Sequence, residues 1–349
     1  MCIMKLNKRV VIAIVGLLAP LVQCHHHGCP PFHGGNVVIN AYQLYPENMD
    51  WDPKLCQAYI SILYNASIGV YNPYTNSLTS LSFPGQSFSS QFHIAGVAWD
   101  KYTSLISVIV TQGSAFRTLG RNVRGDNWLN RYDPIGRKFL WSANLTTVSR
   151  NRYGGFNDLV HDKDGNIWIC GSFPGTLLRV DRSGRKIVEW YVPEVINTTI
   201  FGFTGIALAG KTLLVVDEST GSVLKFDTRK KGNPVPLAVT PEMTVERSDA
   251  MRLPDKYEGK VLLITDHDRG VLVLRSKDGW KTAEYLGLVP SDPTLPPGAL
   301  TAAVSQIGQR ICMVPNWFFD SKVPAGGLAG NRSTFYLVDI TGQVDELLK

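Results

Sequence analysis

The sequence predicts an all-β protein, a six-bladed β-propeller closed by an N-terminal strand. Residues 153–191 read as four short antiparallel strands, and the turns at Asp164-Gly165 and Ser183-Gly184 supply the positive φ that tight hairpins need. A four-stranded meander of this length is one propeller blade, and a single blade cannot bury both of its faces. A third-strand pattern, apolar alternation followed by a polar turn, recurs at intervals of roughly fifty residues, which predicts neighbouring blades.

The repeats divide residues 25–349 into the blades of one domain. The sixth repeat lacks a fourth strand, and the apolar segment 36–44 is expected to fill that place. Such a splice closes the ring and removes an exposed sheet edge. The predicted blades span about residues 48–83, 94–145, 154–191, 203–239, 249–289 and 300–341.

Residues 1–24 are expected to be a secretory signal peptide. They have a basic start and an apolar run over 10–22 that is too short to span a bilayer comfortably. An N-terminal anchor helix is the alternative. We expect a secreted or lumenal protein with no membrane association after the signal is removed. Four Asn-x-Ser/Thr sequons predict a glycoprotein, modified at Asn65, Asn144, Asn197 and Asn331.

Two of the six cysteines fall in the signal peptide. Cys29 and Cys56 are expected to pair and to staple the N-terminal arm to the first blade. Cys170 and Cys312 lie in equivalent strands of the third and sixth repeats, on opposite sides of the ring. Their Cα atoms should be much further apart than the ~7 Å limit for a disulfide, which predicts two buried free thiols.

The charge of the chain excludes one class of partner. The formal net charge is +6, and three of the positive residues lie in the signal peptide. The remainder is small and scattered, so the chain lacks the basic footprint of a nucleic-acid-binding protein. We expect a monomer.

First strands line the channel of a propeller, so the residues at their starts should meet at one mouth. The long connections 111–126 and 320–331 emerge on the same face, and long connections usually mark the functional face. Harmless insertion is the alternative. A buried carboxylic acid could protonate a leaving hydroxyl there, and a histidine could accept a proton. The candidate catalytic residues are Glu47, His93, Asp249, Asp266 and His267.

Aromatic side chains near the same mouth are expected to fold a hydrophobic ligand. The alternative is that these rings wedge neighbouring blades apart, that each histidine is a structural hydrogen-bonding residue, and that residues 266–268 form a charged turn. The candidate substrate-binding residues are Phe156, Asn157, Phe173, Phe203, Thr204, Trp317 and Phe318.

The segments 45–52 and 157–168 resemble the gluconolactonase and senescence-marker propeller family. That resemblance implies a site for one divalent cation, Ca²⁺ or Mg²⁺, with Glu47, Asn157 and Asp249 as three of its four ligands. Thr204 stands where the family has a second Asn, and the spacing from Glu47 to Trp51 is one residue longer. A metal-dependent, lactonase-like hydrolase is therefore one alternative function. The other interpretation is that these side chains only bond the backbone at the mouth.

Four separated segments, LYPENMDWDP, LYNASIGVYNPY, DGWKTAEYLG and LAGNRSTFYLVDIT, carry a second resemblance. They are similar to the secreted fungal propeller proteins of trichothecene biosynthetic clusters and, more distantly, to the propeller hetero-Diels–Alderases of tropolonic sesquiterpenoid pathways. The resemblance implies a mycotoxin or secondary-metabolite biosynthesis protein whose ligand is a small, hydrophobic, oxygenated terpenoid. We expect a cyclase that needs no cofactor and that catalyses either ring closure or a hetero-Diels–Alder reaction. A non-catalytic metabolite-binding or virulence-associated secreted protein is the further alternative.

Overall fold

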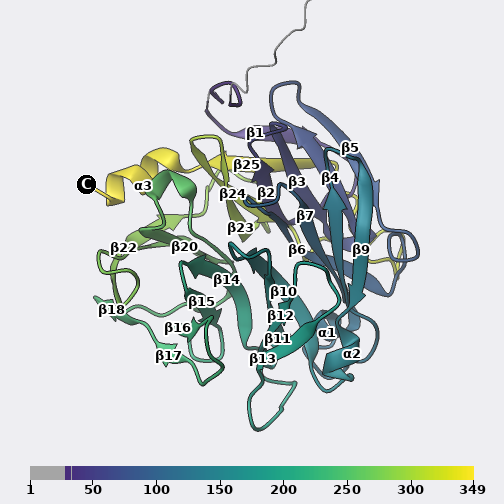
Figure 1. The fold of residues 1–349 in the computed structure, drawn as a ribbon. Helices are drawn as coiled ribbons and strands as arrows, with labels where there is room; N and C mark the ends of the chain where they lie inside the picture. Colours follow the sequence, from purple (N-terminus) through teal and green to yellow (C-terminus); the bar gives the residue numbers. More distant parts are fainter. Residues whose placement is uncertain (1–27, 33) are drawn as a thin grey trace, which may run out of the picture.

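The computed structural model describes residues 28–32 and 34–349 of the 349-residue chain as six β-sheets around a common axis (Figure 1). This confirms the predicted six-bladed β-propeller. The six innermost strands contact one another in a closed ring, which makes them the wall of the channel. These inner strands are β2 (Pro46–Asp52), β6 (Phe92–Trp99), β10 (Gly154–His161), β14 (Phe203–Ala209), β19 (Ser248–Arg252) and β23 (Leu300–Ile307).

Each inner strand is followed outward by antiparallel neighbours joined by turns. The second strands are β3 (Gln57–Ile62), β7 (Ile106–Gln112), β11 (Ile167–Phe173), β15 (Thr212–Asp217), β20 (Val261–Asp266) and β24 (Arg310–Asn316). The third strands are β4 (Ser67–Asn72), β8 (Trp128–Asp133), β12 (Gly175–Val180), β16 (Ser222–Asp227), β21 (Gly270–Arg275) and β25 (Thr334–Asp339). The fourth strands are β5 (Ser77–Ser82), β9 (Lys138–Asn144), β13 (Ile187–Tyr191), β17 (Val235–Pro236), β22 (Thr282–Pro290) and, in the sixth sheet, β1 (Val37–Asn40).

The N-terminal strand closes the ring as predicted. β1 pairs antiparallel with β25, with Val37 opposite Leu337 and Asn40 opposite Thr334. The pairing uses only four of the nine residues in the expected segment 36–44. The two ends of the described chain therefore share one sheet, so opening the ring requires breaking this pairing.

One boundary between blades differs from the sequence-based expectation. β18 (Ala238–Thr240) was expected within the fourth blade, but it pairs in parallel with β22 of the fifth sheet. The reason lies in the two prolines at 234 and 236, which cannot donate ladder hydrogen bonds and limit β17 to two residues. The chain then crosses to the edge of the next sheet.

Every inner strand contains a shift in register, and all six shifts lie near the start of the strand. In β10, for example, Phe156 pairs with Gly171 and the next paired residue is Leu159. A bulge of this kind bends the strand and re-aims its side chains. Asn157 and Asp158, which are consecutive, therefore both reach residues of other inner strands.

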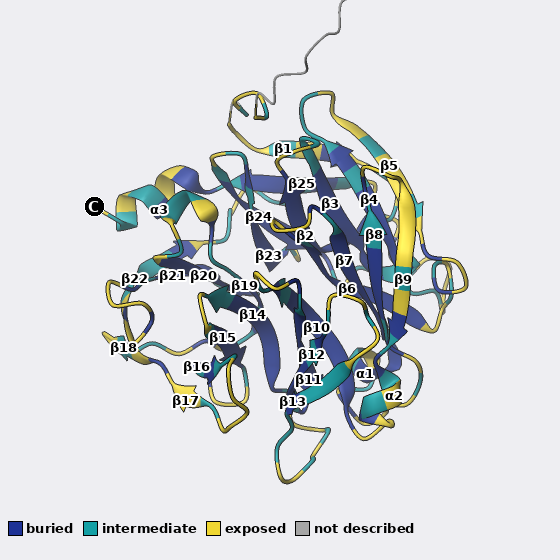
Figure 2. Cartoon of the chain, viewed as in Figure 1, coloured by how far each residue is buried: buried dark blue, intermediate teal, exposed yellow. Residues whose placement is uncertain are grey.

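Apolar side chains fill the spaces between adjacent blades. Figure 2 shows the inner strands buried, whereas β5 and β9 at the outer rim are largely exposed. The structure also has short helices at the turns, and these are η1 (Leu63–Asn65), α1 (Ser114–Arg117), α2 (Thr146–Ser149), η2 (Asp255–Tyr257) and α3 (Thr341–Leu347). Within the described residues, no helix is long and apolar enough to cross a membrane.

Two of the cysteines form a disulfide bond near the start of the described chain, and two others are free. Cys29 and Cys56 form a disulfide bond with a Cα–Cα distance of 5.5 Å, which ties the arm 28–32 to the first blade. Cys170 and Cys312 are buried free thiols. The predicted signal peptide and its cleavage point lie outside the described residues.

Candidate functional site

The channel has two ends of different chemistry. We call the end where the inner strands begin the mouth, and the cavity at the end where they finish the chamber. Both predicted long connections lie at the mouth, because each joins the last residue of a second strand to the first residue of a third strand. The sequence placed all candidate chemistry at the mouth.

The mouth contains a hydrogen-bonded pair of titratable side chains, Asp249 and His267. His267 Nε2 lies 2.9 Å from Asp249 Oδ2. The backbone of His267 is held on both sides, since its N–H donates to Arg247 O and its carbonyl accepts from Thr301 N. Burial opposes protonation of His267, but the hydrogen bond and negative charge of Asp249 outweigh burial and raise the pKa of His267. The arrangement is that of a histidine oriented by a carboxylate.

Asn157 fixes the position of Asp249. Its Nδ2 donates to the carbonyl oxygen of Thr204 at 2.7 Å and to Asp249 Oδ1 at 3.2 Å. The hydroxyl of Thr204 is itself bonded to Ser248 Oγ at 2.6 Å. Three inner strands are therefore joined by polar contacts at this level of the channel. Asn157 and Thr204 were both predicted to contact substrate. In the structure, their side chains form hydrogen bonds with other residues of the protein.

Two glutamates with raised pKa values stand beside this pair. Burial raises the pKa of Glu47 well above its ordinary range, and the negative charges of Asp249 and Asp158 add to the effect. Burial also raises the pKa of Glu218, to about 7, although the nearby His267 opposes the shift. Both groups can therefore remain protonated acids near neutral pH, which is what a general acid requires.

Glu218 is not among the candidate residues from the sequence, but the repeat contains a signal for it. It directly follows Asp217 at the end of β15, just as His267 directly follows Asp266 at the end of β20. Aligning the fourth and fifth blades strand by strand places Glu218 and His267 at equivalent positions. The two side chains approach closely enough for each to influence the titration of the other.

His93 also lies at the mouth, in contact with a long connection. Its Nε2 is 3.1 Å from Nη1 of Arg117, which belongs to the segment 111–126. Burial, assisted by the positive charges of Arg117 and Lys322, lowers the pKa of His93 to about 3. His93 is therefore a neutral imidazole at physiological pH, suited to a hydrogen bond and not to carrying positive charge.

The second long connection reaches the mouth through Lys322. Its Nζ donates to the Tyr64 hydroxyl at 3.1 Å and to the Phe318 carbonyl at 2.9 Å. The ring of Phe318 lies 5.5 Å from that of His267, centroid to centroid. Phe318 is thus the predicted aromatic residue that stands against the candidate histidine.

Asp266 was expected as a catalytic acid, and the structure corrects this expectation. Its Oδ2 forms an ion pair with Arg269 Nη2 at 2.7 Å and accepts the backbone N–H of Glu246 at 3.2 Å. Burial would raise the pKa of Asp266, but the hydrogen bond and charge of Arg269 outweigh it and the pKa is lowered. Asp266 is an ionised residue that shapes the turn before β21.

Four aromatic residues expected to line the mouth are packed between blades. Phe156 belongs to the core between the second and third blades, and Phe203 stacks on Tyr191 of the third blade at 5.9 Å between ring centroids. All four rings are fully or almost fully buried, so they support the mouth from behind and offer a ligand no free surface. The four are Phe156, Phe173, Phe203 and Trp317.

The other two rings of this set show the same role. Phe173 lies beneath the connection 111–126, 5.3 Å from the ring of Phe116. Trp317 packs 6.0 Å from the ring of Phe335 and donates its indole N–H to the carbonyl of Pro296. Alternating apolar sequence identifies such residues as buried without showing whether they face the channel or the next blade.

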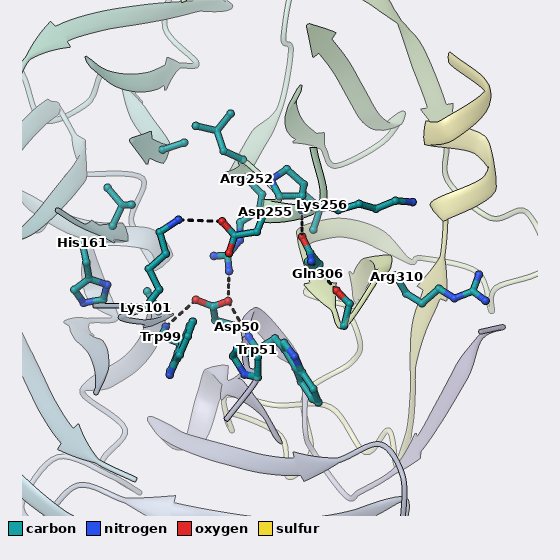
Figure 3. Close-up of a pocket in the computed structure, with 18 of the residues that line it drawn as sticks. Asp50, Trp51, Trp99, Lys101, His161, Arg252, Asp255, Lys256, Gln306 and Arg310 are labelled. Atoms are coloured by element: carbon teal, nitrogen blue, oxygen red, sulfur yellow. Dashed lines mark hydrogen bonds and ion pairs between the residues drawn. The ribbon is translucent and has the colours of Figure 1, made fainter. Parts of the chain in front are cut away.

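The chamber is a cavity of about 1000 Å³ at the opposite end of the channel (Figure 3). It is lined by the final residues of the inner strands and by the arm 28–32. Figure 3 shows side chains from several blades facing this space, among them Asp50, Trp99, His161 and Arg252. The chamber was not predicted from the sequence, because its wall combines strand ends with an arm far away in the chain.

Polar side chains of the inner strands lie between the chamber and the mouth. Asn48 Nδ2 donates to Asp158 Oδ1 at 3.2 Å, and Asp158 Oδ2 accepts the backbone N–H of Ile206 at 3.3 Å. Asn48 and Asp158 line the chamber, whereas their neighbours Glu47 and Asn157 do not. Consecutive residues of one strand thus serve opposite ends of the channel, an outcome of the bulges in the inner strands.

The predicted cation ligands are close together but are not arranged as a ligand set. Asn157 presents its amide nitrogen, which is a hydrogen-bond donor, to Asp249. The hydroxyl of Thr204 is bonded to Ser248 and not directed at a point shared with Glu47 and Asp249. A Ca²⁺ or Mg²⁺ ion needs oxygen atoms directed at one point. Over residues 28–32 and 34–349, no group of three or more His, Cys, Asp or Glu side chains has the geometry of a metal site. The residues present do not fit the implied cation.

The fold and the channel define a class of protein, a six-bladed propeller with a cavity of small-molecule size. The major allergen Mala s 1 of Malassezia sympodialis shares this fold, with a TM-score of 0.75 and 20% identity over 88% of this chain and 96% of that chain. A gluconolactonase from Xanthomonas campestris superposes with a TM-score of 0.53 and 16% identity, over 87% of this chain and 89% of that one. No family model matches the sequence.

Two proteins named for trichothecenes are similar to this one over nearly the whole chain. The trichothecene biosynthesis protein 14 of Trichoderma arundinaceum is 35% identical over 339 residues, covering 92% of each chain. The core trichothecene cluster protein 14 of Fusarium sporotrichioides is 31% identical over 343 residues, covering 92% of this chain and 88% of that one. The chain therefore belongs to the trichothecene cluster protein 14 family.

Proposed function

We propose that this protein acts in trichothecene-type secondary-metabolite biosynthesis as a cyclase that needs no cofactor. Its substrate would be an oxygenated sesquiterpenoid held at the mouth of the channel. The family relationship supports the biosynthetic role, since one relative is named a trichothecene biosynthesis protein and the other a core trichothecene cluster protein. The observation that carries the chemistry is the Asp249–His267 hydrogen bond of 2.9 Å beside a glutamate with raised pKa.

Ring closure between two alcohols needs one proton donor and one proton acceptor. Glu218, protonated below about pH 7, gives a proton to the leaving hydroxyl, and the carbon–oxygen bond breaks to release water. The second hydroxyl of the substrate attacks the same carbon and loses its proton to His267. With Nε2–H donating to Asp249, the Nδ1 atom of His267 is left to accept that proton. The proton on His267 then returns to Glu218, so the cycle balances.

Glu47 and His93 have supporting roles in this proposal. A neutral Glu47 places a hydrogen-bond donor inside the channel, where one of its carboxyl oxygens has no partner among the described residues. His93, neutral and next to Arg117, is placed to orient a substrate oxygen. General acid–base catalysis of this kind contributes roughly 10²–10⁴-fold to a rate.

The direct test is to incubate the purified protein with oxygenated sesquiterpenoid alcohols and to follow loss of one water by mass spectrometry. The proposal predicts a ring-closed product that forms faster than in buffer alone. Equal rates with and without protein would refute ring closure and leave the non-catalytic metabolite-binding alternative. A chelator should leave the rate unchanged, because none of the proposed steps passes through a cation.

We also propose export and glycosylation, consistent with the sequons. None of the four sequon asparagines is buried, and all four lie at the mouth end of their blades. Mass analysis before and after glycosidase treatment tests this. The sequon residues are Asn65, Asn144, Asn197 and Asn331.

A further inference from the structure

We propose that the chamber is a second binding site, separate from the mouth, for an uncharged and oxygenated apolar molecule of sesquiterpenoid size. The inference does not depend on ring closure at the mouth. It rests on three observations: the size of the cavity, the pairing of its charges and the mixture of ring surfaces and hydrogen-bonding groups in its wall.

The size of the cavity fits a small organic molecule. Sites for such ligands occupy roughly 300–1,000 Å³. The chamber, at about 1000 Å³, reaches the upper end of that range. At the end of the chamber that lies toward the mouth, Asn48 and Asp158 are joined by a hydrogen bond between the first and third blades.

Most of the charged groups that line the chamber are held in ion pairs. Asp50 is ion-paired with Arg252 in the centre of the view in Figure 3, and Lys101 is 2.9 Å from Asp255. A second set of pairs lies toward α3, where Lys256 bonds Asp345 at 2.7 Å. A charged ligand would find no unpaired countercharge among these groups, and it would lose its hydration on binding. An uncharged ligand avoids that cost.

The remaining titratable and cationic residues agree with this reading. His161 is hydrogen-bonded to Arg131 and Ser107, and its pKa is lowered to about 3 by burial first and by the charge of Arg131 second. His161 therefore adds no positive charge. Arg310 is paired with Asp339 at 3.4 Å. Lys163 has no ion pair with any residue that the structure describes, and it is exposed to solvent at the rim.

The wall supplies both apolar faces and hydrogen-bonding groups. The rings of Trp51, Trp99 and Phe32 line the chamber, together with aliphatic side chains such as Leu208. The amide groups of Asn48 and Gln306 and the guanidinium of Arg252 lie among them. Apolar surface with a few fixed polar groups is typical of sites that recognise oxygenated hydrophobic molecules.

The arm 28–32 forms one wall and is held from several sides. The disulfide joins Cys29 to Cys56, the Tyr74 hydroxyl donates to the Pro30 carbonyl at 2.6 Å, and the ring of Phe32 lies edge-on to that of Tyr74. A wall fixed in this way keeps its shape in the absence of ligand, which lowers the entropic cost of binding.

Two probes that differ only in charge test the inference. One is an uncharged trichothecene alcohol, and the other is its hemisuccinate ester, which adds a carboxylate to the same ring system. Binding is followed by quenching of tryptophan fluorescence, with Trp51 and Trp99 as reporters, and by equilibrium dialysis. We expect the wild-type protein to bind the alcohol at least tenfold more tightly than the ester.

Two variants identify the chamber as the place of binding. Leu208→Trp puts an indole into the half-buried wall position, and it should weaken alcohol binding by about tenfold or more, which is 1.4 kcal/mol. Asp50→Asn leaves Arg252 without its countercharge and should tighten binding of the anionic ester several-fold. Asp268→Asn is the matched control, because it removes an exposed acid paired with Arg247 at the mouth, and it should change neither probe.

The outcomes separate this inference from the proposed function. Alcohol binding that is lost in Leu208→Trp while water-loss turnover continues supports two sites. The inference is overturned if the folded wild-type protein binds neither probe, if Asp50→Asn fails to favour the ester, or if Leu208→Trp abolishes turnover together with binding. Absence of turnover in wild-type protein that still binds the alcohol refutes ring closure alone. A thermal melt of each variant confirms that it is folded.

Discussion

The two ends of the channel differ in how they treat charge. At the mouth, Asp249, His267, Glu47 and Glu218 lie close together, and within the described residues none of the three carboxylates forms an ion pair with an arginine or lysine. The pKa values of the two glutamates are raised. In the chamber, the carboxylates of Asp50 and Asp255 each face a cation (Figure 3), and Asp345 is paired with Lys256. Titratable groups without a permanent countercharge suit proton transfer, whereas carboxylates paired with arginine or lysine suit the binding of a neutral molecule. The same six strands build both ends.

The largest expected effect comes from disconnecting the pair at the mouth. Asp249→Asn keeps the size of the side chain. It removes the negative charge that orients the His267 ring and raises the pKa of His267. Water-loss turnover should fall by roughly 10²–10⁴-fold, the contribution of general acid–base catalysis. The measurement is the single-turnover rate of product formation. A rate within threefold of wild type would show that the pair has no part in the reaction.

The second largest effect is on stability near the chamber. Arg131 and Asp100 form a buried ion pair that also holds Thr103 and His161. Asp100→Asn leaves a buried cation without its partner and should lower the free energy of unfolding by about 3–5 kcal/mol. Chemical denaturation measures this.

The control for Asp100 is another ion pair at the same end of the channel. Asp255→Asn breaks an exposed pair with Lys101 and should cost about 0–1 kcal/mol. Equal losses for the two variants would contradict the difference in burial on which the prediction depends.

The third prediction concerns pH. The pKa of Glu218 is raised from its ordinary 4.5 to about 7, so this acid is protonated below pH 7 and loses its proton above it. Turnover should therefore fall on the alkaline side of about pH 7. Below that, it should fall again as His267, whose pKa is raised above 6.5, becomes protonated. A pH–rate profile tests both limbs, and Glu218→Gln should reduce turnover at least tenfold below pH 7 (1.4 kcal/mol) and remove the decline above pH 7.

The same shift predicts the sign of a stability change. The folded protein holds the Glu218 proton more tightly than the unfolded chain, so the contribution of this group is present at low pH and is lost as pH rises from 4.5 to about 7. Glu218→Gln should flatten this slope of the unfolding free energy against pH. If the dependence of the unfolding free energy on pH is the same in Glu218→Gln, a carboxyl group other than Glu218 causes it.

The smallest effect is expected at the arm. Cys29→Ser breaks the disulfide to Cys56 and releases one wall of the chamber, although Tyr74 still contacts the arm. We expect binding of the uncharged alcohol to weaken by only a few-fold, with turnover at the mouth unchanged. Equilibrium dialysis and single-turnover rates measure the two quantities. If turnover and alcohol binding fall by the same factor, the mouth and the chamber belong to a single site and the proposal of two sites is wrong.

The six-bladed architecture could be predicted from the sequence because the strands and turns of each blade follow one another along the chain. Turn residues such as Asp164-Gly165 and the repeated third strand fix the number of blades, and the missing last strand requires the segment that contains β1. The exception, β18, joins a neighbouring sheet because prolines end its own strand early. Pairing across a blade boundary is not encoded in one repeat.

The site was less accessible to sequence reasoning. His267 and Asp249 could be placed at the mouth because both stand at strand ends, and the equivalent position of Glu218 was visible in the repeat. The aromatic residues could not be assigned, since alternation shows that Phe156 is buried but not which neighbour it faces. The chamber could not be found either, because it needs the bulges of the inner strands and an arm distant in sequence.

One measurement tests the central claim most directly, and it is made on His267→Ala. The single-turnover rate of water loss and the binding of the uncharged trichothecene alcohol are recorded on the same preparation. The account predicts a rate lowered by roughly 10²-fold or more, since the base is removed, with alcohol binding unchanged because the chamber is intact. Wild-type turnover in His267→Ala, or alcohol binding lost together with turnover, would contradict the division of the channel into a reactive mouth and a binding chamber.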